Sequence, residues 1–190
     1  MYYGELVCLR ALESSDLEAI MKHWNDWNLR STIGVPLPHS ESDRNEWLNE
    51  AMRSNPSRTG TLWLAVTDKK DGRFLGHAGF TNIRYPHQRA RLSISIYDQS
   101  NRSKGYGTDG TRVLLWIAFH ILNLESITLD TFPENEAAIR TYEKAGFKKV
   151  GLLRNTEFID GEFRDLLLMD IIRSEFLEQY PPGTRVGNAT

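Results

Sequence analysis

The chain has 190 residues and a formal net charge of −2; 40% of its residues are hydrophobic and 25% are charged. This composition is typical of a soluble globular protein, and the charge gives no basis for a nucleic-acid-binding surface. The single cysteine, Cys8, excludes an internal disulfide and a CxxC zinc site, so no metal site is predicted. No apolar run is long enough to span a membrane, and the first residues lack a secretion signal, so we expect a cytoplasmic protein.

The first half of the chain predicts a strand, two helices and a three-stranded meander. Ser14 and Ser40 are each followed by acidic residues, as at the start of a helix. Asp71-Gly72 is a hairpin signal, and short connections make the three strands antiparallel. The predicted elements are a strand over residues 5–12, helices over 16–23 and about 40–53, and strands over 61–68, 73–83 and 89–98.

The second half predicts a helical crossover, a further helix and a hairpin. The segment 108–123 is apolar on most faces, so it should form a largely buried helix. Because a helix joins them, the strands before and after it should be parallel. The predicted elements are helices over 108–123 and from Asn135 to Gly146, and strands over 126–132, 147–159 and 162–172, the last two around Asp160-Gly161.

This order, β-αα-βββ-α-β-α-ββ, indicates one mixed α/β (α+β) domain. We expect a mostly antiparallel central sheet with helices on both faces. The domain should cover residues 4–173. Residues 174–190 form a tail that runs into Pro181-Pro182-Gly183, and we expect this tail to be disordered.

A basic loop with two glycines, Asn101-Arg-Ser-Lys-Gly-Tyr-Gly-Thr108, lies between a predicted strand and the buried helix. Glycine lets backbone N–H groups approach an anion closely, and the helix N-terminus adds a positive dipole end. Arg102 and Lys104 add positive charge. The loop therefore predicts a phosphate-binding site.

The same stretch also matches a dinucleotide-binding pattern. Gly105-Tyr-Gly107-Thr-Asp-Gly110 fits GxGxxG, and Asp130 lies where a ribose-binding acid would be expected. However, that pattern requires its first glycine directly after a buried parallel strand. Here mostly polar residues, 99–104, intervene, and the preceding strand belongs to an antiparallel meander. This context argues against a dinucleotide.

Two motifs resemble those of the GNAT superfamily of acetyl-CoA-dependent N-acetyltransferases. Arg102-x-x-Gly105-x-Gly107 resembles the pyrophosphate loop of that family, and Asn135-Glu-Ala-Ala-Ile-Arg-Thr-Tyr142-Glu-Lys-Ala-Gly146-Phe147 resembles its downstream signature. The resemblance covers about Gly4 to Arg173. The opening residues 5–12, and Val150-Gly-Leu-Leu-Arg154 with Asp165, look like the branch of ribosomal-protein N-terminal acetyltransferases. Spermidine acetyltransferases and aminoglycoside-type members are similar too.

The resemblance implies acetyl-CoA as cosubstrate and direct transfer of acetyl to a primary amine, either a protein N-terminus or a small molecule. It implies that Tyr142 protonates the leaving thiolate and that Asn135, on the same helical face, binds the pantetheine or a water. Backbone groups of residues 94–96 should bind the pantetheine. The implied coenzyme-binding residues are Ile94, Ser95, Ile96, Arg102, Ser103, Lys104, Gly105, Tyr106, Gly107, Thr108, Asn135, Tyr142 and Lys144.

The acceptor side departs from the family pattern. Many members carry a glutamate base on the strand before the loop, but the matching residue here is Arg91, which cannot accept a proton. His23, His77 and Glu157 are the alternative bases, beside bulk water. Arg91 favours an acidic acceptor over a polyamine. The expected acceptor-binding residues are Trp24, Trp27, Arg91 and Glu157, with the loop 35–39.

Two other functions stay open from the sequence. One is a non-catalytic acyl-CoA-binding sensor on the same fold, and the other, less favoured, is a dinucleotide-binding oxidoreductase. In addition, edge strands of the last hairpin can pair two copies of the chain, so a homodimer is a hypothesis.

Overall fold

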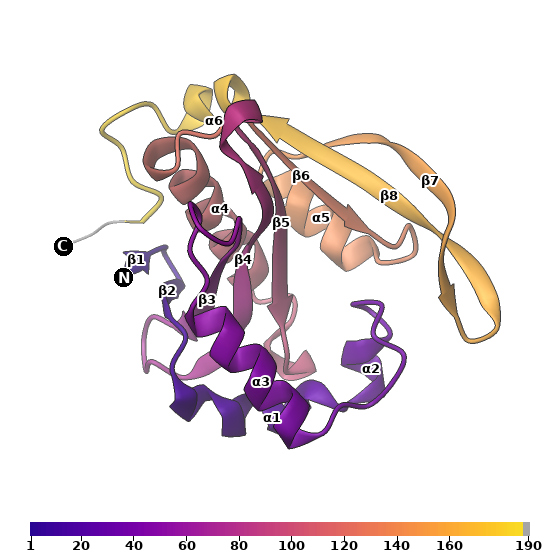
Figure 1. The fold of residues 1–190 in the computed structure, drawn as a ribbon. Coiled ribbons are helices and arrows are strands. Elements are labelled where there is room, and N and C mark those ends of the chain that lie inside the picture. The colour runs from indigo at the N-terminus through magenta and orange to yellow at the C-terminus, as the bar shows by residue number, and fades with distance from the viewer. Residues whose placement is uncertain (188–190) are drawn as a thin grey trace.

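An eight-stranded sheet organises the part of the chain that this computed structural model describes, residues 1–187 (Figure 1). The strand order is β1-β2-β3-β4-β5-β6-β8-β7, and every neighbouring pair is antiparallel except β5 with β6. The strands are β1 (Tyr2–Tyr3), β2 (Val7–Ala11), β3 (Leu62–Asp68), β4 (Phe74–Arg84), β5 (Arg89–Ile96), β6 (Ser126–Thr131), β7 (Lys148–Ile159) and β8 (Glu162–Ile172). The predicted meander, crossover and hairpin are confirmed.

Helices cover both faces of this sheet, as expected. They are α1 (Leu17–Trp24), α2 (Trp27–Arg30), α3 (Glu41–Met52), α4 (Tyr106–Trp116), α5 (Glu136–Lys144) and α6 (Arg173–Gln179). Local sequence sets the ends of two of them. The Ser40 hydroxyl accepts a hydrogen bond from the Asp43 N–H at 3.1 Å, capping α3. Gly146, at φ +104°, follows α5 in a conformation that favours glycine.

The two main hydrophobic cores lie on opposite faces of the sheet. The larger packs β2 to β6 against α4 and α5, with Phe80 and Phe119 fully buried. The smaller lies under α1 and α3 and includes Trp24 and Tyr97. Tyr97, directly after β5, is only 3% exposed. The α1–α3 layer therefore covers the second face at this end of β5.

The parallel pair β5–β6 is short, and this shapes the molecule. Its ladder contains only Arg89↔Ser126, Ala90↔Ile127 and Arg91↔Thr128. Beyond Arg91 the two strands diverge (Figure 1). The β5 backbone from Leu92 onward thus has no strand partner on its β6 side within the described residues, while its other edge stays paired with β4. Unpaired N–H and C=O groups on such an edge are available to a ligand.

The C-terminal segment corrects one expectation. Residues 174–187 are not disordered, because α6 buries Phe176 against Phe119, with ring centroids 5.3 Å apart. The chain then returns along α4, where the Trp116 indole N–H donates to the Thr184 carbonyl at 2.8 Å. The Pro-Pro-Gly sequence suggested disorder, but apolar side chains of the segment, such as Phe176, are buried and hold it in place. Residues 188–190 of the predicted tail lie outside the described residues.

Asp109 in the first turn of α4 ties distant parts of the chain together. Its buried carboxylate accepts hydrogen bonds from the backbone N–H groups of Glu5, Leu6 and Val7 at 3.0, 2.8 and 2.9 Å. In the sequence, Asp109 was part of an apparent dinucleotide motif. In the structure it fixes the start of α4 to the start of β2.

Across residues 1–187, no helix has the length and apolarity needed to cross a membrane.

Candidate functional site

A cleft of about 670 Å³ opens where β5 and β6 diverge. Its walls come from the β5 edge, the end of β6, the loop before α4, one face of α5, the turn after α2, and side chains of β7 and β8. The cleft brings together most of the residues predicted from the sequence: Arg91, Ile94, Ser95, Ile96, Arg102, Ser103, Gly105, Gly107, Thr108, Asn135, Tyr142, Lys144 and Glu157.

The loop at one end of the cleft is shaped to bind an anion. Ser103 and Gly105 both have positive φ, +59° and +90°, and α4 begins directly after Gly105. The first N–H groups of a helix have no partner within it, so they are free to hold an anion. A Cβ on Gly107 would approach the Thr141 side chain of α5 to 3.3 Å, so glycine lets α5 pack closely here. Arg102 also lines the cleft, and within residues 1–187 it has no ion-pair partner.

Two residues of this loop turn their side chains elsewhere. Lys104 is exposed and does not line the cleft. The Tyr106 hydroxyl donates to Asp68 at 2.6 Å, and this bond lowers the pKa of Asp68. Tyr106 therefore braces the loop against the end of β3, and only the backbone of these two residues is suited to bind a ligand.

Tyr142 and Asn135 lie on the cleft face of α5, as the spacing predicted. Tyr142 is 8% exposed, and its pKa is raised to about 12, mainly by burial and also by the charge of Asp130, against a lowering effect of Arg91. Its hydroxyl is thus protonated at neutral pH and can act as a proton donor. The side-chain oxygen Oδ1 of Asn135 accepts from the Ala138 N–H at 3.2 Å, which caps α5 and leaves the side-chain NH₂ as a donor.

Arg91 and Asp130 form a two-pronged ion pair in the cleft. The Arg91 Nε donates to Asp130 Oδ1 and the Nη2 to Oδ2, both at 2.6 Å. This hydrogen-bonded pairing raises the pKa of Arg91. The positive charge of Arg91 is therefore balanced within the protein. The expectation that this charge favours an acidic acceptor leaves out Asp130, because no local pattern indicates that Asp130 lies beside Arg91.

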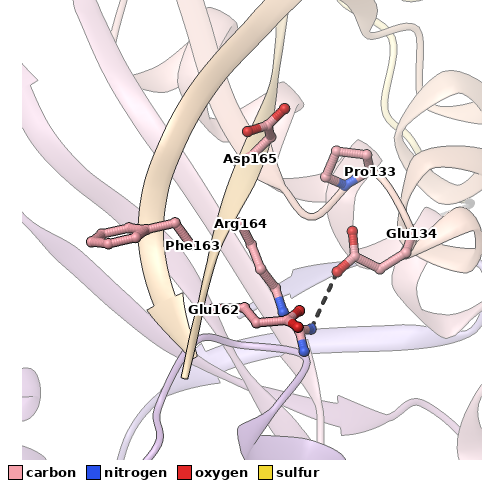
Figure 2. A pocket seen from close by; sticks show the side chains of 6 residues that line it. All are labelled: Pro133, Glu134, Glu162, Phe163, Arg164 and Asp165. Carbon is pink, nitrogen blue, oxygen red and sulfur yellow. Dashed lines mark hydrogen bonds and ion pairs between the residues drawn. The ribbon is translucent and has the colours of Figure 1, made fainter. Parts of the chain in front are cut away.

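Glu157 is the other carboxylate that lines the cleft. It lies on β7 opposite Arg164 of β8 in the strand register. Figure 2 shows that Arg164 instead reaches Glu134, at 3.2 Å, in a neighbouring pocket also lined by Pro133, Glu162, Phe163 and Asp165. Glu157 has no ion-pair partner within residues 1–187. It is thus the cleft carboxylate that remains available to a cation.

The two predicted tryptophans do not line the cleft. Trp24 is buried in the smaller core, stacked with Trp47 at 6.3 Å, with the Arg44 guanidinium 4.5 Å from its ring. Trp27 is 42% exposed and packs against Arg30. The residues that line the cleft from this region come later: Leu29, Thr32, Ile33 and Gly34. The four-residue helix α2, which had no clear signal in the sequence, reverses the chain here and presents those residues.

Neither predicted histidine lines the cleft. His77 is buried in the smaller core, where its Nδ1 lies 2.6 Å from the Tyr97 hydroxyl and its ring packs against Trp47 and Trp63. His23 belongs to α1 and also lies outside the cleft walls. In this structure neither side chain is placed to take a proton from a ligand in the cleft.

No group of three His, Cys, Asp or Glu residues in the described part of the chain is arranged to hold a metal ion.

The burial of His77 predicts a loss of stability in acid. Burial, with a smaller effect of Arg44, lowers its native pKa to about 4; an unfolded histidine has a pKa near 6.5. Between these values only the unfolded chain binds the proton, so the free energy of unfolding should fall by about 3 kcal/mol as the pH drops from 6.5 to 4. Urea unfolding of the wild type and His77→Gln at pH 7 and 4.5 measures this. The variant should lose less stability in acid, whereas equal losses would exclude His77 as the cause.

Comparison with known proteins identifies the family. The model of the acetyltransferase (GNAT) domain matches residues 7–148. The spermidine N(1)-acetyltransferase of Vibrio cholerae is 30% identical over 171 residues, which cover 90% of this chain and 95% of that protein. The spermidine N(1)-acetyltransferase of Escherichia coli K12 is 32% identical over 114 residues, 60% of this chain and 61% of that protein.

Solved structures agree with this assignment. The crystal structure of spermidine N-acetyltransferase from Vibrio cholerae in complex with CoA and spermine matches with a TM-score of 0.80 at 29% identity, covering 90% of this chain and 98% of that one. A GNAT-family acetyltransferase from Bacillus anthracis has the same fold, with a TM-score of 0.80 at 21% identity over 92% of this chain and 99% of that one. The predicted fold class and the resemblance to the spermidine acetyltransferase branch are confirmed, and the chain belongs to the GNAT family of acetyltransferases.

Proposed function

We propose that this chain is an acetyl-CoA-dependent N-acetyltransferase that transfers acetyl directly to a primary amine. The observation that carries the proposal is the cleft itself. It joins an anion-binding loop, an unpaired strand edge and a protonated tyrosine in one continuous space at the divergence of β5 and β6. The names of the relatives support an amine as the acceptor.

The residues present fit acetyl-CoA. The N–H groups at the start of α4, with Arg102, suit the pyrophosphate. The free β5 edge at residues 94–96 offers backbone partners for the amide groups of the pantetheine arm, and the Asn135 NH₂ is a further donor. Lys144 adds a positive charge at the other end of α5. When bound, acetyl-CoA supplies an activated acetyl group as a thioester.

In the proposed reaction one side chain donates a proton and another accepts one. As the amine nitrogen bonds to the acetyl carbon and the carbon–sulfur bond breaks, Tyr142 donates its phenol proton to the leaving sulfur. Glu157 holds the acceptor ammonium, which first releases one proton to solvent to become the attacking amine. Glu157 then takes the second proton, which the nitrogen loses as it bonds to the acetyl carbon. Glu157 thus takes the place of the glutamate that many family members carry at the position of Arg91. Exchange with solvent returns both residues to their starting states.

Arg102→Ala should raise the KM for acetyl-CoA about tenfold, with kcat within about twofold of the wild type. The variant loses a charge-assisted contact to the pyrophosphate, and a tenfold change corresponds to about 1.4 kcal/mol. Steady-state kinetics with varied acetyl-CoA measures it. Arg53→Ala is the matched control, because Arg53 is exposed at the end of α3 and does not line the cleft. An unchanged KM in Arg102→Ala would remove Arg102 from the coenzyme site.

The direct test of the function is amine-dependent thiol release from acetyl-CoA. A panel should include polyamines, simple alkylamines, amino acid amides and peptides. We expect release with at least one amine, together with an equal amount of acetylated product. Tight acetyl-CoA binding without turnover of any amine would instead favour the non-catalytic sensor. The dinucleotide alternative does not fit, because β5 pairs antiparallel with β4 and Asp130 is bonded to Arg91 rather than free for a ribose.

We also propose that two copies pair through β7. This strand lies at the sheet edge and exposes Val150, Leu152, Leu153 and Phe158. An unpaired apolar edge is a template for antiparallel pairing with a second copy. We expect light scattering to give the mass of a dimer and Leu152→Glu to shift it toward a monomer. A monomeric wild type at micromolar concentration would exclude this pairing.

A further inference from the structure

The ion pair in the cleft bears on which amine is acetylated. Arg91 is the last β5 residue paired with β6, and Asp130 lies two residues beyond its register partner, Thr128. The pair therefore bridges the two strands where they begin to diverge. Because Asp130 holds the guanidinium by two parallel bonds, the plane of that group is fixed.

Part of the Arg91 donor set remains unused. A guanidinium has five N–H groups, and Asp130 engages Nε and one N–H of Nη2. No other acceptor within residues 1–187 binds Arg91. The Arg91 side chain lines the cleft and is 46% exposed, compared with 17% for Asp130. The cleft therefore contains an oriented edge of N–H donors whose charge is already balanced.

A carboxylate lies near this donor edge. Glu157 lines the same cleft, and its charge contributes to raising the pKa of Arg91. Tyr142 is close enough to both members of the ion pair that their charges act on its pKa. Glu157, which can bind a cation, and Arg91, which can donate to an oxygen, thus line the same cleft as the proton donor Tyr142.

From this arrangement, and resting on the proposed function, we infer that the acceptor carries a carbonyl or carboxylate oxygen beside its amine, and that Arg91 binds this oxygen while Glu157 receives the amine. An α-amino acid, its amide and a peptide N-terminus share this chemistry. A polyamine has no oxygen that could accept from the unused N–H groups of Arg91. A site built to hydrogen-bond a substrate group discriminates against analogues without it.

The test compares acceptors that differ only in the oxygen-bearing group. Phenylalanine amide and phenethylamine are a matched pair, and their apolar ring suits Ile33, Phe132 and Leu166 in the cleft wall. We expect kcat/KM to be about tenfold or more higher for the amide. Free phenylalanine and a phenylalanine dipeptide, assayed beside it, distinguish a free amino acid from a peptide N-terminus as the source. Spermidine should be a poorer acceptor than the amide.

A double variant tests whether Arg91 is responsible. Arg91→Ala with Asp130→Ala removes the pair without leaving an unpaired carboxylate. The ratio of kcat/KM for the amide to that for the amine should fall toward one. This ratio does not respond to a general loss of activity. Arg89→Ala, at an exposed residue of the same strand, should leave the ratio unchanged.

The outcomes separate the inference from the function. Equal rates on amide and amine in the wild type, a preference for spermidine, or a ratio that survives the double variant would overturn the role of Arg91, while turnover would still support an N-acetyltransferase. If no amine in the panel is turned over, the proposed function itself fails, and this inference fails with it.

Discussion

Tyr142→Phe should lower kcat about a hundredfold and change the KM for acetyl-CoA by no more than about twofold. Proton donation by a positioned side chain contributes factors of this order, and the variant removes only the donor. The ring of Tyr142 packs against Phe147, with centroids 5.9 Å apart, so phenylalanine preserves the fold of α5. Steady-state kinetics with saturating amine measures both constants.

The pH dependence gives a second readout for Tyr142. A proton donor loses activity when the pH rises through its pKa, which is about 12 here because the residue is buried. Tyr142 therefore should cause no fall in kcat between pH 7 and 10.

Tyr85→Phe is the control for the loss of kcat in Tyr142→Phe, because Tyr85 is an exposed tyrosine in a turn outside the cleft. If Tyr142→Phe matched this control in kcat, the thiolate would have to gain its proton from another group.

Asp109→Asn should have the largest effect on stability, lowering the free energy of unfolding by about 3 kcal/mol or more. Hydrogen bonds to charged groups contribute about 1.5–3 kcal/mol each, and an unsatisfied buried N–H is also costly. Asparagine keeps the acceptor for Glu5 but turns an NH₂ group toward the N–H groups of Leu6 and Val7. Native proteins have only about 5–15 kcal/mol in total, so the midpoint of urea unfolding should fall clearly.

A matched change shows whether this effect is specific to Asp109. Glu136→Gln alters a carboxylate in the first turn of α5, but Glu136 is exposed and, within residues 1–187, pairs only with Arg140. Exposed pairs of this kind contribute little, so its unfolding midpoint should stay close to that of the wild type. If both variants unfolded at the wild-type midpoint, Asp109 would not anchor α4 to the N-terminal strand.

The parts of the site that the sequence predicted are those encoded by short-range spacing. The glycines at 105 and 107 mark a backbone conformation and a close approach within one loop. Asn135 and Tyr142 occupy one face of a single helix whose ends are set by its own cap and by Gly146. The parallel pairing of β5 and β6 follows from the helix between them, since crossover connections leave few alternatives.

The parts that escaped prediction depend on long-range contacts. Arg91 and Asp130 are 39 residues apart in the chain, and Asp109 is more than 100 residues from its backbone partners. Nothing in the local sequence indicates such a partner. Trp24 illustrates the other difficulty, since an aromatic side chain near a site is equally suited to a core, and here the α1–α3 layer buries it. From this region, residues of the short helix α2 and of the turn after it line the cleft instead, among them Leu29 and Ile33.

The location of the donor site can be tested by hydrogen–deuterium exchange with and without acetyl-CoA. We expect slower exchange in peptides covering residues 93–96 and 103–108, because those N–H groups lie on the free β5 edge and at the start of α4. An equal concentration of NAD should leave them unchanged. Protection confined to other segments, such as the pocket at residues 162–165, or protection by NAD instead, would contradict the assignment of this cleft to acetyl-CoA.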